Sequence, residues 1–453
     1  MIDQRETICA LATPPGTAGL AVVRVSGAEA LSICGRLFKG RGALSDAAAH
    51  TIHYGWWGDG IDSVTASVFR APHSYTGEDV VEIGCHGGPF VVDQIIDSLT
   101  SAGARVAEAG EFTRRAFLNS KLDLTQVEAV ADVIHAQTRA GAQTAARQLA
   151  GGFTRRLSEL RQTLLMALGY LEVELDFSEE GYEFVSRPAF LETLRQATVD
   201  ATRLAASAQS AHILRSGFYC AVVGYPNAGK SSLFNALLGR PRAIVSHIAG
   251  TTRDYLEESI VEDGYTIHLY DTAGLRSTED TIELQGIQVT SSLIEQSNLV
   301  LVVNDASLGF RHSDALIADI QSRYPTVPIA VVQNKSDLSG TGVPAGELGN
   351  IAQIPTTALS EQGVSELRAY IAAICRESTA AIHDVLINQR QAHLLRVLIG
   401  HLEGASGALA REESPDLIAI DLRSAVRVLG EITGETWNPD LLDTVFSRFC
   451  IGK

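Results

Sequence analysis

The alternation of apolar and polar positions changes character three times along the 453 residues of this chain. Strand-like runs at 19–27 and 79–85, separated by turns that contain Gly and Pro, predict an α+β domain over 1–119. Apolar residues at helical spacing then predict helices through 120–216, and the same pattern returns over 380–453. We expect these two helical stretches to pack as one domain.

A different pattern fills the stretch from 217 to 379. Short runs of continuous apolar residues recur there, with helical segments between them. Strands that are apolar on both faces are typical of parallel sheets covered by helices. The four runs lie at 218–224, 265–271, 298–305 and 327–334. The pattern therefore predicts an α/β domain inserted into a split α-helical domain.

Composition narrows the class of protein without identifying a function. Apolar residues make up 45% of the chain and charged residues 20%, as in ordinary globular proteins. Six cysteines without a C-x-x-C pair favour a reducing compartment over a disulfide framework or a zinc site. Without an evident signal peptide or membrane span, we expect a cytoplasmic protein that does not enter a membrane. The net charge of −17 argues against a broad basic surface for nucleic acid, but not against a local patch.

The sequence GYPNAGKS at 224–231 follows a buried-type strand and precedes a helix, which is the context of a phosphate-binding loop. Backbone N–H groups and the helix N-terminus attract phosphate oxygens, and Lys230 would neutralise charge on the β- and γ-phosphates. Ser231 is the expected Mg²⁺ ligand. A chance glycine turn is the alternative, which the flanking strand and helix disfavour.

The tetrapeptide NKSD at 334–337 indicates guanine rather than adenine. Asp337 can accept hydrogen bonds from guanine N1–H and the exocyclic amine, a donor pair that adenine lacks. Asn334 can bond the other purine edge, and the stem of Lys335 can cover the ring. Because NKSD follows its own apolar strand and comes after GYPNAGKS and DTAG, it argues against an ATP-dependent phosphotransferase.

Further segments complete the predicted GTP site. DTAG at 271–274 ends a strand, so Asp271 would hold the Mg²⁺ shell and the Gly274 N–H would sense the γ-phosphate. In IAGTTRD at 248–254, Thr252 is the expected second Mg²⁺ ligand. Thr357-Ala358, where Ser-Ala is usual, would present an N–H to guanine O6. The predicted GTP-binding residues are Asn227, Ala228, Gly229, Lys230, Ser231, Ser232, Ser246, His247, Ile248, Ala249, Gly250, Thr251, Thr252, Asp271, Thr272, Ala273, Gly274, Asn334, Lys335, Asp337, Thr357, Ala358 and Leu359.

The residue after DTAG is Leu275, where many such switches carry a Gln that orients water. Catalysis must then come from elsewhere in the chain, from a partner or from a cation. Four charged residues follow at Arg276, Glu279, Asp280 and Glu283. By themselves they are more simply interpreted as solvated loop charges. Asn227 could face a monovalent cation beside the phosphates, and a structural turn residue is an equally good interpretation.

Four parts of the chain together resemble the tRNA-modification GTPase family MnmE, also called TrmE. They are the motifs above, SYTGEDVVEIGCHGGP at 74–89, GEFTRRAFLNSKLDLTQVEA at 110–129 and the terminal FCIGK at 449–453. The resemblance covers essentially the whole chain. It implies an N-terminal tetrahydrofolate-binding domain that forms a homodimer, followed by a split helical domain with an inserted P-loop GTPase domain.

The resemblance also implies an activity and its partners. The G domains would meet across the dimer, and potassium would stimulate hydrolysis in place of an arginine finger. With the FAD-dependent protein MnmG, the chain would add a (carboxymethyl)aminomethyl group at C5 of the wobble uridine of certain tRNAs. The one-carbon unit would come from a folate, 5-formyltetrahydrofolate or a related tetrahydrofolate.

Particular positions receive roles from the same resemblance. Potassium would be held by Asn227, Ser246, Ile248 and Thr251, and the catalytic acid would be Glu283. The folate would contact Arg24, Glu82, Lys121 and Lys453, each of which would otherwise be interpreted as a surface charge or a satisfied polar group.

The terminal motif contains the residue that corresponds to the essential thiol of the family, Cys450. A lone Cys near a terminus is usually inert and buried. Beside a flexible IGK tail, this one could instead be delivered to the reacting centre. Cys85 and His86 are expected to shape the turn of the folate pocket rather than to catalyse.

A regulatory GTPase that acts in RNA or ribosome assembly is the main alternative, because the G-domain motifs do not exclude it. The folate-like N-terminal block and FCIGK favour the tRNA-modifying enzyme, since an assembly factor needs neither.

Overall fold

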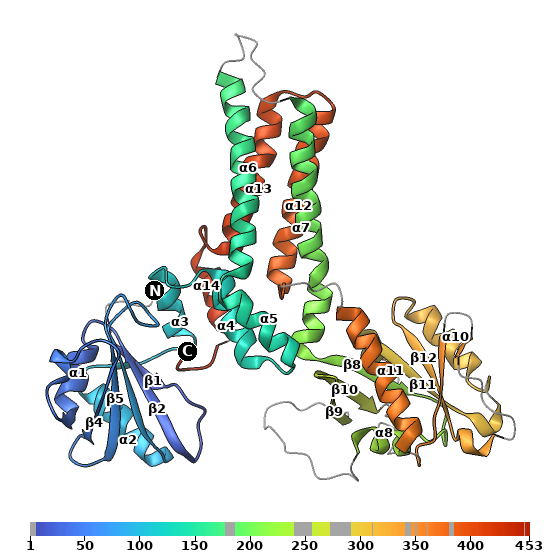
Figure 1. Cartoon of the computed structure of the whole chain (residues 1–453), viewed down its shortest axis with the longest axis horizontal. Helices are drawn as coiled ribbons and strands as arrows, with labels where there is room; N and C mark the ends of the chain where they lie inside the picture. The colour runs from blue at the N-terminus through green and yellow to red at the C-terminus, as the bar shows by residue number, and fades with distance from the viewer. Residues whose placement is uncertain are drawn as a thin grey trace, which may run out of the picture. The chain divides into compact units, whose positions relative to one another are not determined.

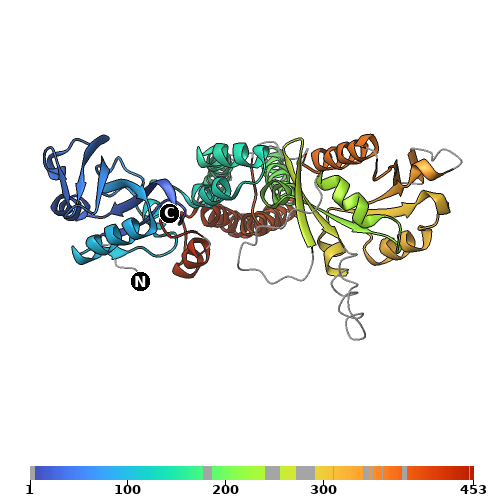
Figure 2. The same ribbon diagram turned by 90° about the horizontal axis from the view of Figure 1, so that it is seen from below.

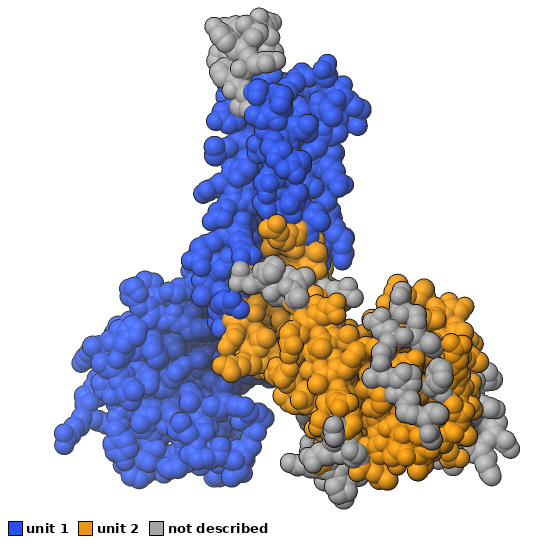
Figure 3. All heavy atoms as spheres, turned by 45° about the vertical axis from the view of Figure 1, so that its right-hand side comes forward, with its two compact units in different colours: residues 1–131, 146–202, 390–453 blue, residues 132–145, 203–389 orange. Residues whose placement is uncertain are grey.

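A computed structural model describes residues 6–176, 186–239, 256–271, 291–309, 311–339, 346–348, 351–359, 361–379, 385–447 and 449–453. The chain separates into two compact units, coloured blue and orange in Figure 3. Unit 1 consists of residues 1–131, 146–202 and 390–453, and unit 2 of residues 132–145 and 203–389. Each unit therefore combines segments that are far apart in the sequence.

The N-terminal part of unit 1 is a seven-stranded sheet with the order β3-β4-β5-β6-β2-β1-β7 (Figure 1). Neighbouring strands are antiparallel except β1 and β7. The strands predicted at 19–27 and 79–85 are confirmed as β2 and β6. The elements are β1 (Ile8–Leu11), β2 (Ala18–Ser26), α1 (Ala30–Leu37), β3 (Phe38–Gly40), η1 (Leu44–Asp46), β4 (Thr51–Trp57), β5 (Asp62–Phe69), β6 (Val80–Gly87), α2 (Pro89–Ser101), β7 (Arg105–Val106) and α3 (Glu111–Leu118).

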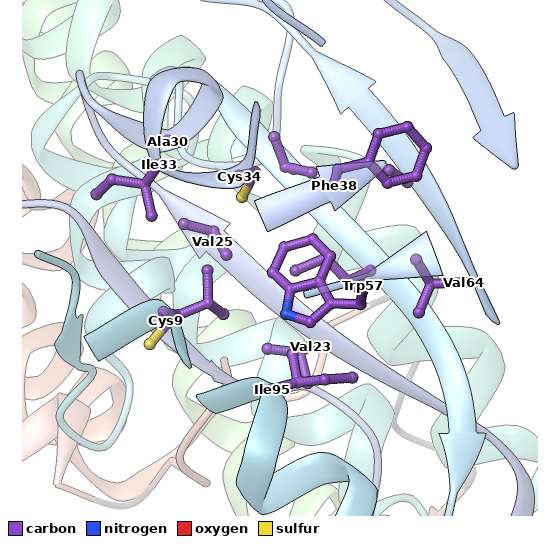
Figure 4. Close-up of a cluster of buried hydrophobic side chains, with 14 of the residues drawn as sticks. Cys9, Val23, Val25, Ala30, Ile33, Cys34, Phe38, Trp57, Val64 and Ile95 are labelled. Atoms are coloured by element: carbon purple, nitrogen blue, oxygen red, sulfur yellow. The ribbon is translucent and has the colours of Figure 1, made fainter. Parts of the chain in front are cut away.

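One face of this sheet is covered by α1 and α2, and the core lies between them and the strands. Trp57 is fully buried there among the side chains that Figure 4 shows. Its indole Nε1 donates to Ser98 Oγ of α2 at 2.9 Å, which compensates the desolvation of the N–H group. The buried ring thus anchors α2 to the sheet.

Helices from both predicted helical stretches pack together in unit 1. Arg390 of α12 donates from Nε and Nη2 to the two carboxylate oxygens of Glu128 in α4, at 2.8 and 2.9 Å. Its guanidinium also reaches the carbonyls of Glu431 and Ile432 near the end of α13. No helix in the described ranges combines the length and apolarity that a bilayer span requires. The helices of the two stretches, of which the parts within 132–145 and 203–216 belong to unit 2, are α4 (Leu124–His135), α5 (Arg139–Leu149), α6 (Gly152–Asp176), α7 (Arg187–Ser216), α12 (Gln389–Ala410), α13 (Pro415–Thr433) and α14 (Pro439–Phe446).

A second seven-stranded sheet forms the centre of unit 2, with the order β13-β14-β12-β11-β8-β10-β9. Its five central strands are parallel, and the edge strands β9 and β13 are antiparallel. Four of the parallel strands, β8, β10, β11 and β12, are the predicted apolar runs, whereas β14 was not predicted. Helices α8 and α11 pack on one face and α10 on the other (Figure 1 and Figure 2). The elements are β8 (Phe218–Val223), α8 (Lys230–Leu238), β9 (Leu256–Glu262), β10 (Tyr265–Asp271), β11 (Leu299–Asp305), η4 (Ala306–Leu308), α10 (Asp314–Arg323), β12 (Ile329–Asn334), η5 (Ser336–Leu338), β13 (Gly346–Leu348), β14 (Ile351–Pro355) and α11 (Glu361–Thr379).

A buried row of amides crosses three of these strands near their carboxyl ends. Asn304 of β11 donates to Gln333 of β12 at 2.6 Å, and Gln333 donates to Gln353 of β14 at 2.8 Å. Paired amides fix the register of the strands because a one-residue slip would leave buried polar groups unsatisfied.

The chain enters and leaves the inserted α/β domain at neighbouring points. Arg215, at the end of α7, forms a two-pronged ion pair with Asp132 at 2.7 and 2.6 Å. The same guanidinium donates to the carbonyls of Leu386 and Ile387 on the outgoing chain, at 2.6 and 3.0 Å. The backbone then turns at Gly217, with φ of +91°, into β8. Arg215 thereby ties together the incoming and outgoing chain.

Candidate functional site

The phosphate loop joins β8 to α8 and adopts conformations that suit anion binding. Asn227 has φ of +62° and Gly229 has φ of +90°. A Cβ on Gly229 would lie 2.2 Å from Asn334 Nδ2, so this position accepts only Gly. The loop ends where α8 begins at Lys230, and the N–H groups of the first helical turn are not used within the helix.

The side chains of the same loop provide the donors and ligands that a magnesium triphosphate needs. Lys230 Nζ lies 2.9 Å from the carbonyl oxygens of both Gly224 and Tyr225, so the ammonium group sits within the loop. Ser231 and Ser232 are exposed on the first turn of α8. An ammonium, exposed hydroxyls and a helix N-terminus together fit phosphate and Mg²⁺.

The guanine motif is bonded directly to the phosphate loop. Asn334 is buried at the end of β12, donates from Nδ2 to Ala228 O at 2.9 Å and accepts from Ala358 N at 3.2 Å. Thr357 Oγ1 donates to Asp337 Oδ1 at 3.1 Å, so the unusual Thr still supplies a hydroxyl to this carboxylate. Asp337 and Leu359 are exposed. The Asp337 carboxylate is thus accessible from solvent.

Asp305 belongs to this site, although the sequence patterns did not reveal it. It ends β11 opposite Asn334 of β12, and its Oδ2 accepts from Lys335 Nζ at 2.6 Å. Burial alone would raise the pKa of Asp305, but hydrogen bonds from Lys335 and Ser307 outweigh burial and lower this pKa below its ordinary value. The signal in the sequence is only an acid that follows a strand, which is too common to select this residue.

Several predicted residues lie outside the described ranges or only partly within them. Asp271 is placed by its backbone as the last residue of β10, paired with Val222 of β8 and Leu256 of β9. The remaining switch positions fall in 240–255 and 272–290, which are not described. They are Ser246, His247, Ile248, Ala249, Gly250, Thr251, Thr252, Thr272, Ala273, Gly274, Leu275 and Glu283.

A second site lies in unit 1 around Arg24 of β2 and Glu82 of β6, which face each other in the sheet register. Arg24 Nε and Nη2 both approach Glu82 Oε1, at 2.9 and 2.8 Å. The guanidinium lies over the rings of Tyr75 and Phe112, at 5.1 and 5.6 Å from their centroids. The Arg24 guanidinium is thus held by Glu82 on the neighbouring strand and by two aromatic rings.

The C-terminal tail is docked at this site, so the expectation of a flexible IGK segment is wrong. Ile451 forms a bridge with Ala109, and Arg24 Nη1 donates to Gly452 O at 3.4 Å. Gly452 has φ of +98°, and a Cβ there would lie 2.1 Å from Leu11 O. These contacts involve mainly the backbone, which is why hydrophobic patterning does not reveal them.

Lys121 and Lys453 are both predicted to contact the folate, but only Lys453 lies close to Arg24 and Glu82. Burial and the charge of Arg24 lower the pKa of Lys453, and the nearby charge of Glu82 partly opposes them. Lys121 Nζ instead donates to Pro72 O at 3.0 Å. Among the described contacts, none joins Lys121 to the other three predicted folate residues.

Cys85 and His86 lie within the last residues of the strand β6 rather than in a turn. His86 bonds Asp62 twice, from its backbone N to Oδ2 and from ring Nδ1 to Oδ1, each at 2.7 Å. Burial, with a smaller contribution from the charge of Asp62, raises the pKa of Cys85 to about 11. Cys85 is therefore a protonated thiol at neutral pH.

Among the six cysteines, Cys450 alone is exposed. Burial raises the pKa of Cys9 to about 11 and that of Cys375 to about 12, and it raises the pKa of Cys34 and Cys220 as well. The carbonyl of Cys450 accepts from Gly110 N at 3.3 Å, so the docked tail fixes its position. Cys450 is therefore the cysteine whose side chain is accessible to solvent.

Comparisons with known proteins agree with this arrangement. Residues 7–121 match a family described as the GTP-binding protein TrmE N-terminus, and residues 124–450 match the MnmE helical domain. A tRNA modification GTPase MnmE from Chlorobium phaeovibrioides is 40% identical, over 99% of this chain and 98% of that protein. The same protein from Symbiobacterium thermophilum is 41% identical over 99% of each chain, and that from Chlorobium luteolum is 42% identical over 98% and 97%.

Solved structures that resemble part of this chain include GTP-binding domains. The G domain of a T. maritima FeoB iron transporter covers 35% of this chain and 98% of its own length, with 26% identity and a TM-score of 0.28. That score is too low to add to the fold described above. The two family matches and the full-length identity are decisive: the chain belongs to the MnmE family of tRNA modification GTPases.

Proposed function

We propose that this chain hydrolyses GTP in the cytoplasm and, with an FAD-dependent MnmG-like partner, adds a (carboxymethyl)aminomethyl group at C5 of the wobble uridine of certain tRNAs. The observation that supports this most is the exposed Cys450 in a docked tail. A regulatory GTPase in RNA or ribosome assembly needs no such thiol. The curated relatives, named tRNA modification GTPases along their whole length, support the same proposal.

The Arg24–Glu82 pair supports a folate as the source of the one-carbon unit. Arg24 bonds only Oε1 of Glu82, and no described hydrogen bond reaches Oε2. A carboxylate oxygen can accept from the amino edge of a pterin, and a cation such as Lys453 suits the glutamate tail of the cofactor. We therefore propose 5-formyltetrahydrofolate or a related tetrahydrofolate as the ligand of Arg24, Glu82 and Lys453, with Lys121 as a less direct contributor.

Mass analysis of wobble uridine tests the main proposal. In cells that lack this protein, the modified nucleoside is expected to disappear from the substrate tRNAs and to return when the gene is restored. If the modification persists while ribosomal particles accumulate as assembly intermediates, the regulatory alternative is correct and the proposal is wrong.

Potassium is proposed as the catalytic cation because a water-orienting Gln is missing after DTAG and Asn227 lies in the phosphate loop. Ser246, Ile248 and Thr251 would complete the potassium site. Thr252 would complete the coordination shell of the magnesium ion, and Glu283 would be the catalytic acid.

GTP turnover is expected to be about tenfold or more faster in KCl than in NaCl at the same ionic strength, because a correctly placed cation stabilises charge in the transition state. Initial rates of phosphate release in the two salts measure this difference. RbCl, whose cation is close to K⁺ in size, serves as the matched control. Equal rates in NaCl and KCl would refute the potassium proposal.

Homodimerisation is proposed through the sheet face of unit 1 that α1 and α2 do not cover. Ile52, Tyr54 and Trp56 of β4 are 71, 67 and 52% exposed. Leu20 of β2 is 62% exposed and lies over Gly84 on the same face. Exposed apolar patches of this kind mark protein interfaces, and a second copy of the chain is the proposed occupant.

Because the chain is acidic, the MnmG-like partner is proposed to contribute much of the affinity for tRNA.

A further inference from the structure

The contacts between NKSD and the phosphate loop form two parallel connections. Lys335 Nζ donates to Asn227 O at 2.9 Å, and Asn334 Nδ2 donates to Ala228 O at 2.9 Å. Neighbouring residues of the base-binding motif therefore hold neighbouring carbonyls of the phosphate loop. The second connection is made by a buried amide, whereas the first depends on a flexible lysine that needs its own support.

Asp305 provides that support. Its Oδ2 accepts from Lys335 Nζ at 2.6 Å, and its Oδ1 accepts from the backbone N and the hydroxyl of Ser307 at 3.0 and 2.6 Å. The Asp305 side chain is only 10% exposed. Because protein donors engage both carboxylate oxygens, Asp305 is arranged to act on Lys335 rather than on a bound ligand.

The backbone conformations of Asn227 and Lys335 explain why the contact with Asp305 matters. Asn227 and Lys335 both adopt left-handed conformations, with φ of +62° and +58°. Residues other than Gly keep such conformations only when the surrounding contacts determine them. The Lys335–Asn227 bond joins these two strained residues to each other, and the ion pair with Asp305 fixes the ammonium group between them.

We propose that Asp305 is a positioning residue of the nucleotide site, which acts through Lys335 to hold the phosphate loop at Asn227. In this way it couples recognition of the base to the position of the catalytic cation. The part of this proposal that concerns the cation rests on the proposed potassium requirement, and the part that concerns the nucleotide does not. Without the charge of Asp305, the chain keeps every group proposed to contact the nucleotide, but Lys335 no longer holds the phosphate loop in position.

Asp305→Asn in the full-length protein tests the proposal, because the amide keeps the size of the side chain and removes its charge. Affinity for N-methylanthraniloyl-GDP is expected to fall about tenfold, as for the loss of one charge-assisted hydrogen bond at a binding site. The KCl concentration that gives half-maximal GTP turnover is expected to rise several-fold. Circular dichroism and thermal unfolding establish that the variant is folded, and Asp305→Ser replaces it if it is not.

Two further variants separate positioning from a general structural role. Ser307→Ala removes a bond to Oδ1 but leaves the ion pair, so GDP affinity is expected to stay within about threefold of wild type. In a Lys335→Met background, Asp305→Asn is expected to cause no further loss, since Asp305 acts through the lysine.

Two outcomes overturn the proposal: wild-type GDP affinity in Asp305→Asn, or additive losses in the double variant. If wild-type turnover is the same in KCl and NaCl, the potassium requirement fails, and the GDP titrations still decide the role of Asp305.

Discussion

Cys450→Ser is expected to abolish wobble-uridine modification while GTP turnover stays within about twofold of wild type. The reason is that the thiol and the GTP site belong to different compact units, since Cys450 lies in unit 1 and the described GTP-site residues lie in unit 2. A hydroxyl is similar in shape to a thiol, although smaller, and is a far weaker nucleophile at neutral pH. Mass analysis of tRNA, together with phosphate release from the same preparation, measures both activities.

Cys85→Ala is the matched control for this prediction. Cys85 is a buried thiol in the same unit, and burial raises its pKa to about 11, so it supplies no thiolate at neutral pH. The control is expected to retain modification, and a maleimide should label wild type and Cys85→Ala once per native chain but leave Cys450→Ser unlabelled. Loss of GTP turnover in folded Cys450→Ser would show that the two activities are not separable.

Asp337→Asn is expected to lower GTP affinity by about 10⁴-fold and to change the preferred base from guanine to xanthine. Sites built to bond a particular donor reject ligands that lack the complementary group by factors of this size. Asp337 is exposed beside the phosphate loop and receives a hydrogen bond only from Thr357 Oγ1 among the described contacts. An amide in its place can donate to the C2 carbonyl of xanthine, which stands where guanine has its amine.

Competition of GTP and XTP against N-methylanthraniloyl-GDP or its xanthine counterpart measures the change. Thr357→Ser is the matched control, because it keeps the hydroxyl that bonds Asp337 and is expected to leave GTP affinity within about twofold. A variant that still prefers guanine would mean that Asp337 does not read the base edge.

The sequence predicted most of the architecture, because the burial of a strand or helix face is enough to produce a recognisable pattern of apolar residues. The four apolar runs became β8, β10, β11 and β12, since strands covered on both faces must be apolar throughout. The central strand β14 was not predicted. The edge strands β9 and β13 were not predicted either. Each has a neighbour on one side only, and a sequence such as LEESIVE carries no continuous apolar signal.

Site residues could be predicted where they belong to a motif of fixed spacing in the sequence. They were missed where residues from distant parts of the sequence meet only in the folded chain. Lys230, Asn334 and Asp337 follow from GYPNAGKS and NKSD. Asp305 does not, because its importance depends on β11 lying beside β12. The docked tail was missed for a related reason, since the contacts of Ile451 and Gly452 are made with a strand and a turn more than 300 positions earlier in the chain.

The tie that Arg215 makes between the incoming and outgoing chain has a consequence for folding. Residues 217–379 separate α7 from the next host segment, and closing a loop of that length costs entropy before α12 can pack. Once the inserted domain is folded, its ends are held at Leu386 and Ile387, and the effective loop shrinks to roughly ten residues. The closure penalty then falls by about 2 kcal/mol, or four halvings of loop length. A folded insert thus lowers the entropy cost of bringing the two host segments together.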